Sequence, residues 1–278
     1  MQRQAFLPLV TYPDANTDAI AANAIQMAAC LDAGLHALAL NPDIPDVSSP
    51  LARFLTNLPD LIGKAEETSR KRGEHLLKKV TEEGKKAGVE VTTETLRYNA
   101  SFLPEAAATL ARYHDCVLCG WEGSNMTSQM VAEAVIFGAG RPTILLPELS
   151  PVGSLQHVAV AWDGSRVAAR TLGDAEHLLR RAGTVSVLTV LDEKPLSDKE
   201  AGERLAAGLK ARGFPATAVN ITAEDCPIAT TLQERALELG AGLLVMGAFG
   251  HTRVRDFVLG GATQGVLDDL RLPVMLSH

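Results

Sequence analysis

Residues 243–263 decide the fold class, and they read Leu-Leu-Val-Met-Gly-Ala-Phe-Gly-His-Thr-Arg-Val-Arg-Asp-Phe-Val-Leu-Gly-Gly-Ala-Thr. The apolar start of this stretch predicts a buried strand, and residues 262–270 predict a helix. Between them the glycines follow the pattern G-x2-G-x9-G-G-A-T. Glycine lets the backbone approach a ligand closely, and the unbonded amide groups at a helix start attract an anion. The stretch therefore predicts a strand, a phosphate-binding loop and a helix.

A purely structural role is the competing interpretation, because glycines also make turns at the ends of strands and helices. Two features favour binding. The two glycine pairs are separated by nine residues and lead into a helix, and Asp163 ends another predicted strand. Ligands of open α/β sheets bind beyond the carboxyl ends of the strands, where these elements meet. The pattern does not contain GxxxxGK[ST], so the loop is not of the Walker type.

Strands and helices alternate through the second half of the chain. Ser165 and Ser197 are suitable N-caps, and Pro227 suits a first helical turn. Strands that are joined by helices form right-handed βαβ units and a parallel sheet. The predicted strands are 157–162, 185–190, 216–221, 243–247 and 274–276, and the predicted helices are about 165–181, 197–212, 227–240 and 262–270.

The first half repeats this order. An apolar run ending at Asp14 parallels the run ending at Asp163, and Gly120-Trp-Glu-Gly123 parallels Gly247-Ala-Phe-Gly250. Such internal similarity indicates a duplicated unit. We predict two tandem Rossmann-like α/β domains, residues 1–149 and 152–278, each with a five-stranded parallel sheet flanked by helices. Helices of the first half are predicted at about 17–33, 60–87, 103–113 and 126–138, with the extra residues of this half within 43–86.

With these motifs the chain resembles the universal stress protein family over both halves, as a tandem two-domain member. That family carries G-x2-G-x9-G-[Ser/Thr] between its fourth strand and last helix, and its α/β fold binds ATP or AMP. The resemblance implies an adenine nucleotide in the second domain, with Mg²⁺ as a further candidate cofactor. By position, the base would lie near Ala161, Trp162, Asp163 and Val190, the ribose and phosphates along Met246, Gly247 and Gly250, and the phosphates on Gly260, Gly261, Ala262 and Thr263.

The chain departs from the family signature at two places. Gly261 stands where the signature has Ser or Thr, so the loop keeps an amide but not that hydroxyl. In the first half no glycine pair follows Gly123 after nine residues, and residues 126–137 read as continuous helix. We therefore predict a degenerate first domain that keeps the fold without the nucleotide. Within the second loop, His251 and its neighbouring arginines either neutralise phosphate or are solvated loop charges.

Composition excludes several classes of function. The net charge is −7 and there is no basic tract, which argues against nucleic acid as a partner. No apolar run approaches the roughly 18–20 residues that span a bilayer. The N-terminus shows no secretory signal, so we expect a cytoplasmic protein without a membrane contact. Cys116 and Cys119 lie in a predicted strand, where they point to opposite faces, so we expect core thiols rather than a redox or metal pair, and no metal site.

Three functions remain to be compared. The first is a stress-response protein that binds ATP or AMP as a regulatory ligand and is not an enzyme, because no catalytic Lys, base, carboxylate cluster or GxSxG motif is present. The second is a nucleotide-free interaction or scaffold module of the same fold. The third is an ATP-hydrolysing enzyme. For assembly, the terminal strands 143–146 and 274–276 are expected to pair within the chain, with a homodimer as a further option.

Overall fold

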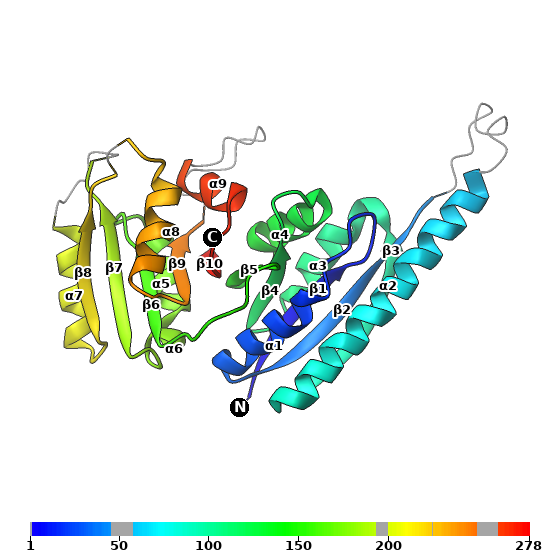
Figure 1. Ribbon diagram of the computed structural model, residues 1–278, viewed down its shortest axis with the longest axis horizontal. Coiled ribbons are helices and arrows are strands. Elements are labelled where there is room, and N and C mark those ends of the chain that lie inside the picture. Colours follow the sequence, from blue (N-terminus) through cyan, green and yellow to red (C-terminus); the bar gives the residue numbers. More distant parts are fainter. Residues whose placement is uncertain (1, 46–57, 193–199, 224, 249–260) are drawn as a thin grey trace. The chain divides into compact units, whose positions relative to one another are not determined.

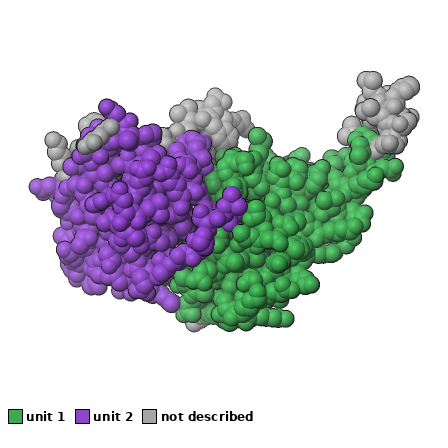
Figure 2. All heavy atoms as spheres, in the orientation of Figure 1, with its two compact units in different colours: residues 1–141 green, residues 142–278 purple. Residues whose placement is uncertain are grey.

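The computed structural model describes residues 2–45, 58–192, 200–223, 225–248 and 261–278. The chain divides into two compact units, unit 1 with residues 1–141 and unit 2 with residues 142–278 (Figure 2). The sequence placed the boundary after the strand at 143–146, whereas this division places it just before that strand. Both units are α/β, as the sequence predicted, with helices on sheets that are mostly parallel.

Unit 1 is built on four parallel strands in the order β3-β2-β1-β4 among the described residues (Figure 1). The strands are β1 (Arg3–Val10), β2 (Ala33–Asp43), β3 (Val91–Asn99) and β4 (Cys116–Trp121). The helices are α1 (Ala19–Leu31), α2 (Leu58–Ala87), the 3₁₀ turn η2 (Ala100–Phe102), α3 (Leu103–Ala111) and α4 (Met126–Gly138).

Unit 2 has the strand order β5-β10-β9-β6-β7-β8 (Figure 1). The second-half strands β6 to β10 pair in parallel with one another, as predicted. The strands are β5 (Thr143–Pro147), β6 (His157–Ala161), β7 (Thr184–Val190), β8 (Ala216–Ile221), β9 (Leu243–Gly247) and β10 (Val274–Ser277). The helices are α5 (Arg166–Asp174), α6 (Glu176–Leu179), α7 (Ala201–Ala211), α8 (Ile228–Glu238) and α9 (Gly261–Asp268).

The two terminal strands pair as the sequence led us to expect. β5 runs antiparallel to β10, with Met275 opposite Ile144. Since β5 belongs to unit 2 in the division by compactness, this pairing lies inside one unit. The division by compactness thus counts β5, which the sequence assigned to the first domain, with unit 2 and leaves four described strands within residues 1–141.

The extra residues of the first half form a helix far longer than its counterpart. Helix α2 has 30 residues, and the corresponding α7 has 11. The buried positions of α2 recur at helical spacing, and two of them are glycines. A Cβ on Gly84 would come 2.4 Å from Val91 Cγ2, and one on Gly73 would come 3.0 Å from Ala39 Cβ. These glycines let the helix axis approach β2 and β3 closely.

One predicted helix is interrupted. The sequence predicted a single helix over about 165–181, but α5 ends at Asp174 and α6 begins at Glu176. Gly173 in the last turn of α5 is a poor helix former, which weakens the helix at this point. The N-cap prediction for Ser165 is confirmed, because its Oγ accepts a hydrogen bond from the Ala168 amide at 3.2 Å.

Cys116 and Cys119 are both buried in β4, as predicted, and neither is in a disulfide. Burial raises the pKa of each thiol to about 12. A thiol with so high a pKa is protonated at neutral pH and is a poor nucleophile or metal ligand. The pair is part of the core of unit 1.

Candidate functional site

Three strand ends of unit 2 meet at the place where a ligand is expected. β6 lies between β9 and β7, with Val160 opposite both Val245 and Val187. After β6 the chain crosses to β7 on one side, and after β8 it returns to β9 on the other side. This reversal is a topological switch point, where the crevice outside the strand ends is open to a ligand.

The predicted base-binding residues lie at this switch point. Ala161 ends β6, Val190 ends β7, and Trp162 follows β6 with its amide donating to the Leu188 carbonyl at 2.8 Å. Val190 is buried, whereas Ala161 and Trp162 are partly exposed. The structure therefore brings Ala161, Trp162 and Val190 to the ends of two adjacent strands.

Asp163 is held by a tight turn at the end of β6. Its Oδ1 accepts a hydrogen bond from the Ser165 amide at 2.9 Å, and Gly164 between them has φ +73°. A left-handed φ is easily adopted only by glycine, so the turn depends on Gly164. Ser165 then caps α5. The exposed carboxylate of Asp163 is thereby fixed beside the switch point by residues that immediately follow it in the sequence.

Gly247 has a packing role that sequence reasoning did not assign. A Cβ at this position would lie 2.6 Å from the Ala168 amide nitrogen and 2.8 Å from Val167 carbon atoms. The first turn of α5 therefore packs directly on the end of β9. A glycine here is required by this contact whether or not a ligand is bound. Met246, beside it, is buried.

Of the glycine-rich segment between β9 and α9, the structure describes the C-terminal end, where α9 begins. α9 begins at Gly261, Ala262 is partly exposed, and Thr263 is 5% exposed. Helix α9 packs closely on α8, since a Cβ on Gly265 would come 2.7 Å from Ala229 Cβ. The remaining predicted loop residues, Gly250, His251 and Gly260, lie outside the described residues. The predicted phosphate contacts are therefore described only at the N-terminal turn of α9.

The last two residues, Ser277 and His278, hydrogen-bond to the segment that follows β9, and no local sequence pattern predicted these contacts. The Ala248 amide donates to the Ser277 carbonyl at 3.0 Å, and the Ala248 carbonyl lies 3.2 Å from His278 Nδ1. Thr171 of α5 also reaches the Ser277 carbonyl, at 3.4 Å. The chain that leaves β9 toward the glycine loop is thus held by the end of β10.

Unit 1 carries a buried polar network at the corresponding strand ends. β1 and β2 are the counterparts of β6 and β7, and at their carboxyl ends lie Thr11 and Asn41. Thr11 Oγ1 donates to the Leu40 carbonyl at 2.6 Å and lies 2.7 Å from Ser69 Oγ, which in turn reaches Asn41 Oδ1 at 3.2 Å. All three side chains are buried. Helix α2 thus supplies Ser69 to a closed polar network.

The helix start that would face a phosphate in unit 1 is capped by the protein. Asn125 precedes α4, and its Oδ1 accepts a hydrogen bond from the Ser128 amide at 2.9 Å. Its Nδ2 donates to the Asp14 carbonyl at 2.7 Å. Asn16 folds back beneath this loop, with its Oδ1 accepting from the Val10 amide. The loop before α4 is therefore tied to the segment after β1 by protein–protein hydrogen bonds, and the absence of a nucleotide from this half stays a prediction.

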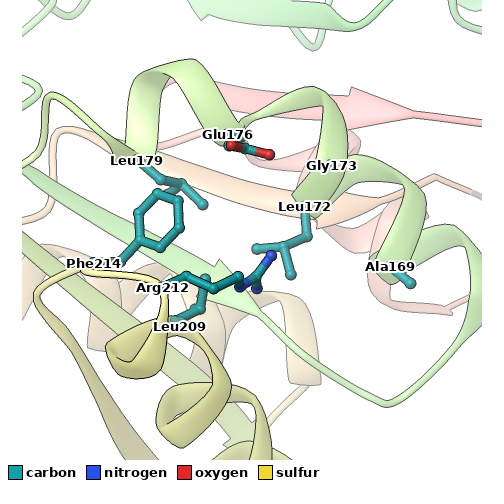
Figure 3. A pocket seen from close by; sticks show the side chains of 8 residues that line it. All are labelled: Ala169, Leu172, Gly173, Glu176, Leu179, Leu209, Arg212 and Phe214. Atoms are coloured by element: carbon teal, nitrogen blue, oxygen red, sulfur yellow. The ribbon is translucent and has the colours of Figure 1, made fainter.

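Other features of unit 2 lie away from the switch point. A pocket of about 120 Å³ separates α5 and α6 from the end of α7, and its lining includes Leu172, Leu209 and Phe214 (Figure 3). Arg180 and Arg212 flank the Phe214 ring, with guanidinium carbons 5.1 and 5.6 Å from its centroid. None of the predicted nucleotide residues lines this pocket.

Within the described residues, no group of three or more His, Cys, Asp or Glu side chains is arranged to hold a metal ion. Among the helices in that part of the chain, none combines the length and the apolar content that a membrane crossing requires.

The fold defines unit 2 as a doubly wound α/β domain whose switch point lies at the ends of β6, β7 and β9. Residues 154–278 match the model of the Universal stress protein family. The second domain of the chain therefore belongs to the universal stress protein family, and the first is a second α/β unit in a tandem layout that fits a universal stress protein fold. No curated protein matches the sequence at a significant level.

Solved structures resemble the fold of the whole chain. A universal stress protein from Archaeoglobus fulgidus DSM 4304 is 17% identical, with 98% of this chain and 95% of that chain covered and a TM-score of 0.67. One described as a putative universal stress protein, from Pseudomonas aeruginosa UCBPP-PA14, is 15% identical, with coverage of 99% and 93% and a TM-score of 0.58. The cytoplasmic domain of a prokaryotic cation chloride cotransporter is 11% identical, with coverage of 99% and 95% and a TM-score of 0.50. At these identities the likeness concerns the fold alone.

Proposed function

We propose that unit 2 binds an adenine nucleotide, ATP or AMP, as a regulatory ligand, and that the chain is a cytoplasmic stress-response protein. One observation carries the proposal. The ends of β6, β7 and β9 meet beside the glycine-rich segment that leads into α9, and Asp163 is fixed at the same place. Membership of the second domain in the universal stress protein family supports the same function.

Each group has a chemical task in this proposal. Ala161 and Val190 provide apolar contact for the base at adjacent strand ends, with Trp162 beside them. The exposed carboxylate of Asp163 accepts hydrogen bonds from the base or the ribose. The first-turn amides of α9, at Gly261, Ala262 and Thr263, donate to phosphate oxygens. Mg²⁺, when present, neutralises phosphate charge and is held by the nucleotide rather than by a protein cage.

A regulatory ligand is favoured over a substrate. Asp163 already accepts a hydrogen bond from the Ser165 amide, so it is engaged in a turn rather than poised beside a nucleophile. No carboxylate cluster that would bind a catalytic metal occurs within the described residues. Positioned charges and metal ions supply most of the catalysis in phosphoryl transfer. We therefore expect the bound nucleotide to persist rather than turn over.

The test is calorimetry on the full chain with ATP, AMP and GTP. We expect binding of an adenine nucleotide and discrimination against GTP. Asp163→Ala should weaken binding about 10- to 100-fold, as expected for loss of a charged hydrogen bond of about 1.5–3 kcal/mol. Asp163→Asn keeps the acceptor for the Ser165 amide and separates loss of charge from loss of the turn. Asp14→Ala, the matched change in unit 1, should have no effect. Absence of binding at millimolar nucleotide would refute the proposal.

A nucleotide-free interaction module is the second candidate. Gly261 replaces the hydroxyl residue of the family signature, and unit 1 carries a buried network of Thr11, Asn41 and Ser69 at the corresponding strand ends. A cotransporter domain shares the fold, which indicates that the architecture is not confined to stress proteins. Mass spectrometry of the small molecules that co-purify with the native chain separates the two candidates, because retained ATP or AMP would exclude this one.

A further inference from the structure

β3 is the outer strand of unit 1, and its outward side carries no partner within the described residues. It pairs with β2 on its inner side along its whole length, from Leu35 opposite Val91 to Asp43 opposite Asn99 (Figure 1). Its residues 92–95 are consecutively exposed, and Tyr98 is 48% exposed. An unpaired strand of this length presents a row of unbonded amide and carbonyl groups.

The register shows which groups point outward. The Leu35 amide donates to the Glu90 carbonyl at 2.8 Å, and Leu35 lies opposite Val91. In a parallel ladder a residue bonds the two neighbours of the residue opposite it. The even-numbered residues of β3 therefore bond β2, and the odd-numbered residues direct their amide and carbonyl groups away from the sheet. These outward residues are Val91, Thr93, Thr95, Arg97 and Asn99.

β3 lacks most of the devices that protect an edge strand, and Glu94 and Arg97 are its only charged residues. Natural edge strands are commonly shielded by proline, by bulges or by a covering helix. β3 contains no Pro or Gly, and its Thr, Val, Leu and Tyr residues favour extended structure. Helix α2 touches the strand near its two ends, through Gly84 beside Val91 and through Glu66, whose Oε2 lies 3.1 Å from Arg97. Thr93 and Thr95 lie between these contacts and remain exposed, so α2 leaves the outer flank open.

We propose that β3 pairs antiparallel with β3 of a second copy of the chain, about a two-fold axis through Thr95. A two-fold axis perpendicular to the sheet keeps each side chain on its own face, so odd residues must oppose odd residues. The register of full overlap places Thr95 opposite itself, Thr93 opposite Arg97 and Val91 opposite Asn99. On the other face, Glu94 meets Leu96.

Charge and length select this register. No like charges oppose one another when the axis passes through Thr95. A register centred on Glu94 would place that carboxylate opposite its own copy, which is unfavourable. Registers centred beyond Thr95 shorten the overlap. The strand is therefore complementary to itself, which is the requirement for an isologous dimer.

The size of the contact sets the expected strength. One strand pair covers less than the roughly 1,200 Å² of a stable standard interface, so we expect a dimer that depends on concentration. Sedimentation velocity on the full chain should show dimer at ~0.1 mM protein and monomer on dilution, as mass action requires for a dissociation constant in the micromolar range.

The decisive experiment places a charge on the axis. Thr95→Lys and Thr95→Glu should each be monomeric at the concentration where the unmodified chain dimerises, because each charge meets its own copy. An equal mixture of the two variants should dimerise again, because opposite charges then meet. Thr92→Lys and Thr92→Glu are matched controls on the same strand, and each alone should keep the dimer since Thr92 opposes Tyr98. Circular dichroism checks that every variant is folded.

A crosslink gives an independent readout. In a Cys226→Ser background, Thr95→Cys should form an interchain disulfide under mild oxidation, because the paired residues lie within the Cα separation that a disulfide allows. Thr93→Cys should not, because that residue lies far from its own copy in the antiparallel register. A monomeric chain at ~0.1 mM protein that also fails to crosslink through position 95 overturns the proposal. Dimers of Thr95→Lys and Thr95→Glu alone overturn it equally.

Discussion

His36 Nδ1 lies 3.0 Å from His114 Nε2, at a point where β2 and the end of α3 meet in unit 1. His114 Nδ1 is 3.1 Å from the Leu110 carbonyl, which can only accept, so Nδ1 carries the proton of the neutral ring. His114 Nε2 then accepts from His36. The outer nitrogen of His36 is 3.5 Å from the Glu94 carboxylate, and the Phe6 ring stacks on His114. The arrangement requires a neutral His114.

This pair predicts a pH dependence of unit 1. Burial lowers the pKa of His114, and His36 and Arg141 lower it further, against raising effects of the Leu110 carbonyl and Asp115. As pH falls below the ordinary value of 6.5, the unfolded chain takes up a proton that the folded chain resists. The stabilisation by a neutral His114 is therefore complete above that pH and is lost as pH falls through the window beneath it.

The measurement is urea unfolding at about pH 7.5 and at about pH 5, with the unfolding free energy compared between variants. His114→Gln should lower stability at the higher pH and lose less of it on acidification than the unmodified chain. His278→Gln, which replaces a histidine of unit 2 that contacts the Ala248 carbonyl, serves as the control for loss of a titratable histidine outside unit 1. Equal acid sensitivity of the unmodified chain and His114→Gln would contradict this role of the pair.

Gly247 predicts a stability effect that is separate from ligand binding. Gly247→Ala places a Cβ 2.6 Å from the Ala168 amide nitrogen, so α5 must shift, and we expect a loss of about 1–3 kcal/mol. Gly173→Ala is the matched control, since a Cβ there meets nothing within 4 Å and a helical alanine should stabilise α5 by about 0.5–1 kcal/mol. Thermal unfolding without nucleotide measures both. An unchanged melting temperature for Gly247→Ala would show that α5 adjusts without cost.

The buried network of unit 1 predicts coupled losses. Thr11→Val removes the hydroxyl that bonds the Leu40 carbonyl and contacts Ser69 Oγ, leaving buried polar groups unpaired at a cost of about 1–3 kcal/mol. Ser69→Ala should cost a similar amount. Because the two hydroxyls share one bond, the double variant should lose less than the sum of the single losses. Strict additivity in a double-mutant cycle would show that the network does not act as a unit.

The cysteines predict two classes of thiol reactivity. Cys226 is exposed and Cys30 is partly exposed, whereas Cys116 and Cys119 are buried with pKa values raised to about 12. An aromatic disulfide reagent should label Cys226 first in the native chain, and Cys116 and Cys119 should react only on unfolding. Cys226→Ser should remove the fastest phase. Rapid labelling of the β4 thiols in native conditions would indicate that unit 1 opens locally.

Local sequence signals predicted most of the elements. Alternating apolar runs and helical patterns place β6 to β10 and α1 to α4 within a few residues of their observed bounds, because each signal lies within one element. The turn from Asp163 to Ser165 is local in the same sense. The break between α5 and α6 was missed, because one glycine near a helix end does not by itself decide whether the helix continues.

The candidate site was predicted only where its residues follow a motif. Asp163 and the start of α9 were chosen in this way, since they are at fixed positions relative to strand ends, and their contact with a ligand stays a prediction. Sequence reasoning did not predict that Gly247 packs on Val167 and Ala168. It also did not predict the hydrogen bond from the Ala248 amide to the Ser277 carbonyl. Both contacts join segments far apart in the sequence, and neither residue type is distinctive for its role.

The sequence by itself determined the α/β class, the tandem order of elements and the glycine-rich loop after β9, because these are properties of spacing and periodicity along the chain. The tertiary structure alone decided that Thr11, Asn41 and Ser69 form a buried network in unit 1, that His36 meets His114, and that β5 is counted with unit 2. Such contacts depend on which faces pack together. Gly73 and Gly84 let helix α2 lie close to the sheet, and α2 contributes Ser69 to the buried network. No local sequence pattern predicts how closely a helix packs on a sheet.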